Sequence, residues 1–152
     1  MNMPFDPNQF LDMQINESNS TERIPVPPKE YTAIIDKVEC KTWAKKDDPS
    51  VGGLKLSLTW IIDDAEVREL LGRDKVTVRQ EIMLDLNDAG MLDMGKGRNV
   101  ALGRLREALG LNDPGQAFAF SMLQGRVAKV NVTHRLDKDA IYEEIKQVAR
   151  LA

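Results

Sequence analysis

One short stretch of the chain combines two side-chain types that suit the binding of single nucleic acid strands. Trp43 stands among Lys41, Lys45 and Lys46. Ammonium groups neutralise phosphates, and an indole face stacks on a nucleobase, a contact worth roughly 1–3 kcal/mol for each base. Neither interaction reads the base sequence, so the pattern favours a surface that holds single strands with little sequence preference.

Further basic residues recur on the polar sides of later segments that alternate between apolar and polar residues. If these segments become neighbouring strands, the side chains reach a common outer face. They are Lys55, Arg79, Lys129 and Arg135. A purely structural interpretation competes, because lysines coat most solvated strands and a Trp at a strand end often packs at the rim of a core. The aromatic residues expected inside the core are Tyr31, Trp60 and Phe118.

Nucleophilic catalysis lacks a complete set of residues in this sequence. His134 is the only histidine, and no Ser or Cys stands in an elbow-like motif. Cys40 is the only cysteine, which excludes an intrachain disulfide and any zinc site built from several cysteines. We expect His134 at the surface near a strand end and Cys40 in the core, and we predict a protein that is not an enzyme.

Two loop segments resemble known ligand-binding motifs, but each lacks one residue that the motif requires. Residues 90–97 nearly spell a phosphate-binding loop, but Gly97 stands where a Ser or Thr must hold magnesium. The segment from Asp85 begins like a calcium loop, but Lys96 replaces the Glu of the twelfth position. The sequence therefore predicts no metal site and no cofactor.

The composition describes one domain preceded by an acidic segment. The 152 residues are 42% hydrophobic, enough for a buried core. Residues 1–23 hold four acids against one Arg, a net charge of −3 that equals the net charge of the whole chain. We expect residues 1–23 to form a disordered acidic arm and residues 24–152 a single domain. No membrane span or secretory signal is recognisable, which predicts a cytoplasmic protein.

Alternation of apolar and polar residues predicts a mainly β domain. Residues 54–62 show it most clearly, with five apolar side chains on one face. In the segment before them, Ile34, Val38 and Cys40 are expected on a common side. Strands are expected from Tyr31 onward, over 54–62, near 75–84 and near 126–134.

Helical signals are fewer. Asn99 is a suitable cap, a stripe of Leu and Ala follows at a spacing of 3.6, and Gly110 supplies a stop. Residues 141–150 fit a helix by apolar spacing, or a last strand after a hairpin turn at 137–139. Three strands, a helix and then further strands is the order of the OB-fold, a five-stranded, partly open barrel with its helix between strands 3 and 4. An antiparallel sheet with one packed helix is the alternative.

Three segments resemble a phage-encoded family of OB-fold single-stranded DNA-binding proteins. They are Ile24–Ile35 with its proline-rich lead, Gly53–Trp60, and Asn99–Gly110 with its Leu-Gly end. The resemblance covers about residues 24–135 and departs at Lys29, where the family usually has Gly. It favours a strand over residues 142–148.

The resemblance implies a protein that coats and protects single-stranded DNA during replication or recombination, without catalysis and without a cofactor. Its partners would be single-stranded DNA and replication or recombination proteins, with a homo-oligomer also allowed, in the host cytoplasm and away from membranes. The basic and aromatic residues named above would form the binding site. The end Val148–Ala152 lacks an acidic, aromatic tip, so recruitment through such a tail is not expected.

Two other functions are compatible with the same sequence. One is a structural or adaptor protein that uses the barrel to contact proteins. The other is a regulator whose acidic arm mimics nucleic acid and occupies the basic groove of a partner. Removal of residues 1–23 separates these ideas, because a mimic loses its activity whereas a strand binder keeps its affinity.

Overall fold

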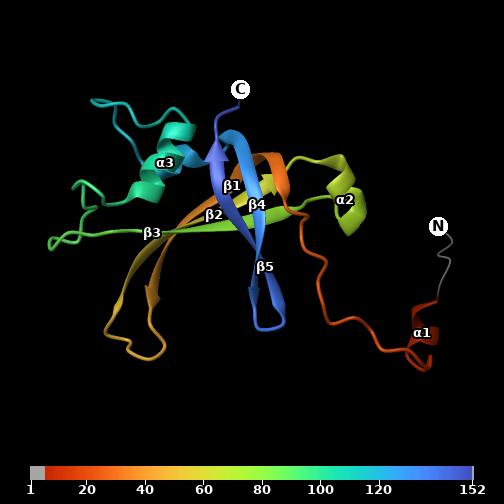
Figure 1. The fold of residues 1–152 in the computed structure, drawn as a ribbon. Coiled ribbons are helices and arrows are strands. Elements are labelled where there is room, and N and C mark those ends of the chain that lie inside the picture. The colour runs from red at the N-terminus through yellow and green to blue at the C-terminus, as the bar shows by residue number, and fades with distance from the viewer. Residues whose placement is uncertain (1–5, 152) are drawn as a thin grey trace.

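Residues 6–151 are described by the structure, a computed structural model (Figure 1). Residues 1–5 of the expected arm, together with Ala152, lie outside the description. In chain order the elements are α1 (Pro7–Phe10), β1 (Lys29–Ala44), β2 (Gly52–Ile62), α2 (Ala65–Leu71), β3 (Thr77–Met83), α3 (Val100–Ala108), the 3₁₀ turn η1 (Phe120–Leu123), β4 (Val127–Asp137) and β5 (Ala140–Ala149).

The strands form one antiparallel sheet in the order β3-β2-β1-β4-β5. Helix α3 lies between β3 and β4 in the chain and contacts β5. The edge strands β3 and β5 come close to each other, but within residues 6–151 no hydrogen-bonded ladder joins them. The expected mainly β domain is confirmed, residues 140–149 are a strand rather than a helix, and the sheet stays open at this seam.

Strand β2 supplies the centre of the core. Leu56, Leu58, Trp60 and Ile62 are completely shielded from solvent, as their alternation predicts. The indole Nε1 of Trp60 donates a 2.8 Å hydrogen bond to Oε1 of Gln80, which satisfies the one polar atom of that side chain.

Tyr31 and Phe118 were also predicted to lie in the core, and the structure confirms this for Tyr31 alone. Tyr31 is buried, and its hydroxyl donates to the carbonyl oxygen of Pro27 at 2.7 Å. Phe118 is only half-buried and packs against the core from outside. Tyr31 therefore belongs to the core as predicted, and Phe118 belongs to its rim.

Strand β1 changes the side it presents to the core at a β-bulge. Its register against β2 shifts between Ile35 and Lys37, so Asp36 has no partner there. Before the bulge, the buried residues are Tyr31, Ala33 and Ile35. A bulge adds one residue and reverses the alternation, which moves the even-numbered residues to the core side beyond it.

The bulge corrects the expectation for the first strand. Ile34 and Val38 are both half-buried, but they lie on opposite sides of the sheet because the bulge separates them. The prediction that Cys40 is a core residue is wrong, since its side chain is exposed. Cys40 lies on the core side of β1, directly opposite the fully buried Leu56, yet its own side chain remains exposed.

Helix α3 begins after Asn99 as expected, but the side chain does not cap the helix. Asn99 has a left-handed backbone (φ 51°), and its side chain instead holds the preceding loop together. It accepts from the backbone N–H of Asp85 at 2.8 Å and donates to the carbonyl oxygens of Asp85 and Asp93. Within residues 6–151, no helix is both long and apolar enough to cross a membrane.

The N-terminal arm meets the domain at Val26. All residues from Asp6 to Ile24 are exposed, and Val26 is the first buried residue. The carboxylate of Glu143 accepts from the backbone N–H of Val26 at 3.2 Å and forms an ion pair with Arg23. Nε2 of His134 lies 2.6 Å from the carbonyl oxygen of Val26 and, like Glu143, fixes the arm where it joins the sheet.

Replacing Leu58 with Ala tests the core described here. Leu58 is fully buried, so we expect the substitution to lower the free energy of unfolding by about 2–5 kcal/mol through lost burial and a residual cavity. Urea denaturation followed by circular dichroism measures the change. The matched control is Leu70→Ala on α2, where the side chain is 58% exposed and we expect a change within about 0.5 kcal/mol. Equal effects would contradict the core assignment.

Candidate nucleic-acid interface

The strand register gathers basic side chains on the outer face of β1, β2 and β3. Directly opposed residues of an antiparallel pair point to the same side, and Leu58 and Trp60 point into the core. Lys41 lies opposite Lys55, whereas Thr59 lies opposite both Lys37 and Arg79. We call this surface the β1–β3 face; its members are Lys37, Glu39, Lys41, Trp43, Gly53, Lys55, Ser57, Thr59, Arg79, Glu81 and Met83.

Trp43 occupies the hairpin end of the β1–β3 face. Its partner on β2 is Gly53, and Nε1 of the indole lies 3.3 Å from the position that a Cβ of Gly53 would occupy. The indole therefore lies against β2 at a place where no side chain stands in the way. Nε1 is shielded from solvent and finds no hydrogen-bond partner among residues 6–151, a costly arrangement for a donor.

Carboxylates are interleaved with the cations of this face. Lys41 lies 3.9 Å from a carboxylate oxygen of Glu39, and Lys55 lies 3.7 Å from one of Glu81. Glu81 also accepts a 3.3 Å hydrogen bond from the hydroxyl of Ser57 in the middle of the face. Arg79 is exposed and, among the described residues, has no carboxylate oxygen within 4.0 Å. The face is therefore mixed in charge, with Arg79 available for an anion.

The remaining predicted site residues lie beside this face or apart from it. Lys45 and Lys46 are exposed in the loop that follows Trp43. Lys129 lies on β4 opposite Thr32, a residue of β1 that precedes the bulge. Its Nζ is 3.9 Å from a carboxylate oxygen of Glu30. The structure thus brings Lys41, Trp43, Lys55 and Arg79 together, with Lys45 and Lys46 adjacent, and leaves Lys129 separate.

Arg135 belongs to the β4–β5 hairpin, where it meets an aromatic residue. Its guanidinium lies 5.0 Å from the ring centre of Tyr142, its cross-strand partner, and its Nε donates to Glu144 at 2.5 Å. The β1–β2 and β4–β5 hairpins project toward the same side of the molecule (Figure 1). Arg135 therefore extends the basic surface from a second hairpin.

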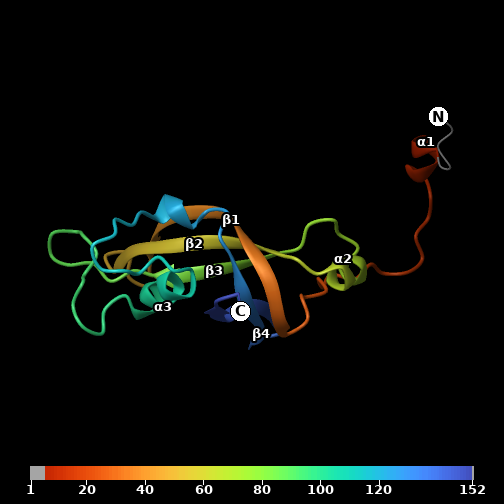
Figure 2. The same cartoon turned by 90° about the horizontal axis from the view of Figure 1, so that it is seen from above.

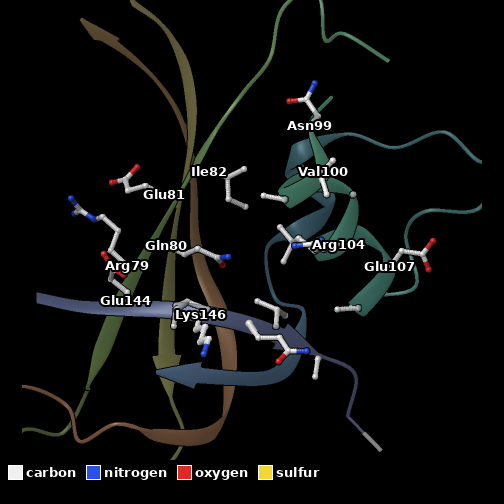
Figure 3. A pocket seen from close by; sticks show the side chains of 18 of the residues that line it. Arg79, Gln80, Glu81, Ile82, Asn99, Val100, Arg104, Glu107, Glu144 and Lys146 are labelled. Atoms are coloured by element: carbon white, nitrogen blue, oxygen red, sulfur yellow. The ribbon is translucent and has the colours of Figure 1, made fainter. Parts of the chain in front are cut away.

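A cleft of about 1310 Å³ opens along the seam between β3, β5 and α3 (Figure 3). Arg79 and Arg135 both line it, so the seam connects the β1–β3 face with the β4–β5 hairpin. We call it the seam cleft. Its other basic lining residues include Arg104 on α3 and Lys146 on β5.

Sequence reasoning missed Lys37 and Tyr142. Lys37 has the same parity as Lys41 and Trp43, so the alternation alone was enough to find it. Tyr142 depends on the last element being a strand, because only the hairpin turn places it opposite Arg135. The signal for Tyr142 was therefore the turn at 137–139.

The pKa values displaced from their ordinary range belong to residues away from this face. Burial, and then the negative charge of Asp64, raise the pKa of the Tyr31 hydroxyl. The pKa of Asp64 is lowered, first by the hydrogen bond from the backbone N–H of Val67 and also by Lys29. Asp64 caps α2 through that bond, so its shift reflects a structural role.

Within residues 6–151, no three His, Cys, Asp or Glu side chains gather in a way that could hold a metal ion. No protein-family model matches the sequence, and no curated protein matches it as a relative. The function is therefore argued from the surface itself.

Replacing Gly53 with Ala tests the position of the Trp43 indole. The added methyl would lie 3.3 Å from Nε1, tighter than an ordinary contact, so we expect the indole to move outward into solvent. Acrylamide quenching and a shift of Trp emission to longer wavelength measure this, because Trp60 stays buried. The control is Gly103→Ala on α3, where nothing lies within 4 Å of the new methyl. Unchanged quenching in Gly53→Ala would contradict the contact.

Proposed function

We propose that this chain is an OB-fold protein that binds single-stranded DNA with little sequence preference and protects it during replication or recombination. The strand order β3-β2-β1-β4-β5, the approach of β3 to β5 and the position of α3 between β3 and β4 support the fold. OB-folds bind oligonucleotides on the face of strands 2 and 3, between the loops that join strands 1–2 and 4–5.

The observation that carries the proposal is the common outer position of Trp43, Lys41, Lys55 and Arg79. Trp43 offers a surface for base stacking, and the three cations follow it across the sheet. From Gly53 to Thr59 is six residues of β2, about 20 Å at roughly 3.3 Å per residue. This length suits several nucleotides, within the roughly 4–16 that OB-fold sites occupy.

The ion pairs on the face do not oppose this function. Exposed pairs such as Lys41 with Glu39 contribute only about 0–1 kcal/mol, so a phosphate can replace the carboxylate at small cost. The face holds four cations, Lys37, Lys41, Lys55 and Arg79. If each neutralises one phosphate, the slope of log K against log salt is about −3. Binding is thus expected to weaken steeply with salt.

Replacing Trp43 with Ala is the first test. We expect affinity for fluorescein-labelled oligo-dT to fall roughly 5- to 150-fold, the equivalent of one lost stack. Fluorescence anisotropy at two salt concentrations measures it, with duplex DNA and unstructured RNA in parallel. The control is Met94→Ala, an 80% exposed apolar side chain outside the face, which should leave affinity unchanged.

Each outcome of that titration has a distinct meaning. Tight, salt-sensitive binding to oligo-dT that depends on Trp43 supports the proposal. Equal binding by the Trp43 and Met94 variants removes Trp43 from the site. Absence of binding to all three nucleic acids rejects the function and favours an adaptor or mimic that contacts proteins.

Replacing Glu81 with Gln should strengthen binding. Glu81 places a negative charge in the middle of the face and engages both Lys55 and Ser57. The amide keeps a hydrogen-bond acceptor for Ser57 but frees Lys55, so we expect affinity for oligo-dT to rise several-fold at low salt. Glu69→Gln on α2 makes the same charge change away from the face and should have a smaller effect. If both variants gain affinity for oligo-dT equally, the net charge of the protein explains the gain, and Glu81 does not act at the binding site.

A further inference from the structure

The seam cleft leaves two strand edges without partners. β3 and β5 are the ends of the sheet, so each has one edge whose backbone N–H and C=O groups lack a neighbouring strand. Such edges pair readily with an extended segment, which adds as a further strand. The cleft is therefore suited to an extended peptide.

The walls of the cleft indicate which peptide it would take. Apolar side chains from three elements line it, including Ile82, Leu105 and Val148. Arg104 and Lys146 also line it and are exposed, and among the described residues neither has a carboxylate oxygen within 4.0 Å (Figure 3). Four glutamates line the cleft as well, namely Glu81, Glu107, Glu143 and Glu144, so the cleft is mixed in charge and its free positive groups include those of Arg104 and Lys146. An extended segment with one apolar side and an acid that can approach these two cations matches these features.

The N-terminal arm of this chain contains a segment with such an apolar side, in which Leu11 has a helical backbone at the end of α1 and would extend on binding. Leu11, Met13 and Ile15 alternate with Asp12, Gln14 and Asn16, the pattern of a strand with one apolar side. Leu11 is 81% exposed and Ile15 is 72% exposed, so residues 6–151 leave most of both side chains uncovered. Six residues extend over about 20 Å, close to the length of the seven-residue β3.

We propose that residues 11–16 of one copy of this chain bind the seam cleft of a second copy, where they pair as an added strand with the open edge of β3. The side of the segment that carries Leu11, Met13 and Ile15 would cover the apolar wall of the cleft. The acidic residues of the arm would approach Arg104 and Lys146. The arm carries a net charge of −3 over residues 6–23, complementary to these two unpaired cations. This inference does not rest on the proposed function.

The position of the arm favours a second copy over the same molecule. Figures 1 and 2 both show α1 on the side of α2, with α3 on the opposite side of the molecule. The arm therefore runs from its anchor at Glu143, a residue that also lines the seam cleft, toward the α2 side of the molecule and away from α3. A contact of this kind joins unlike surfaces, so copies would associate head to tail.

Two full-length variants test the arrangement by complementation. Leu11→Lys with Ile15→Lys disables the arm and keeps the cleft, whereas Arg104→Glu with Lys146→Glu disables the cleft and keeps the arm. All four side chains are exposed, so both proteins should fold, and circular dichroism with thermal melting checks this. The control is Arg73→Glu with Lys96→Glu, the same charge change at exposed residues outside both the cleft and the β1–β3 face.

Sedimentation velocity of nuclease-treated protein gives the result. We expect the unsubstituted chain and the control to associate with rising concentration, and each double variant alone to associate at least tenfold more weakly. An equimolar mixture of the two variants should form a complex of two chains and no larger species, because only one arm and one cleft remain. A monomeric unsubstituted chain, a mixture without heterodimer, or equal loss in the control would overturn the proposal.

Discussion

The bulge at Asp36 is the constraint on which both the core and the candidate interface depend. Strand β1 pairs with β4 over Lys29–Ile34 and with β2 over Ala33–Ala44. Without an extra residue, a uniform alternation would point the side chains after Asp36 to the wrong side of the sheet. The extra residue keeps Ile35 in the core before the bulge and directs Lys37 outward after it. The chain secures this point with hydrogen bonds: Gly125 donates to the carbonyl oxygen of Ile35 at 2.8 Å, and the side-chain amide of Gln124 donates to that of Asp36 at 3.2 Å.

The candidate interface has charged side chains on the outer side of strands whose other side is packed into the core. Beneath it, β2 buries Leu58 and Trp60 without any solvent exposure, so the outer residues of the same strand are held on a rigid base. Above it, Lys41 forms an exposed ion pair with Glu39 at 3.9 Å and Lys55 a partly covered one with Glu81 at 3.7 Å, and a polyanion can displace such long pairs at small cost. Trp43 is the most constrained member of the face, since its indole lies against Gly53 with a shielded N–H.

The open seam gives the molecule a second kind of surface. Closing the sheet would satisfy the backbone groups of β3 and β5, yet the two strands only approach each other, and α3 covers one end of the gap. The seam cleft joins the β1–β3 face through Arg79, so a peptide at the seam and a nucleic acid strand on the face would be neighbours. The proposed contact between copies and the proposed binding of a strand would therefore use adjacent surfaces of this fold.

Local alternation was enough to predict much of this protein. The pattern of residues 54–62 placed Trp60 in the core, and the turn at 137–139 allowed the last strand, because side-chain period and turn chemistry act over a few residues. The sequence alone did not reveal the bulge at Asp36, the exposure of Cys40 or the use of the Asn99 side chain, since each depends on contacts with distant segments. Nor did it show that Lys41, Lys55 and Arg79 lie close together on the outer side of β1, β2 and β3, whereas Lys129 lies apart from them on β4, opposite Thr32. Tertiary structure decided these points because strand register, and not sequence spacing, sets which side chains become neighbours.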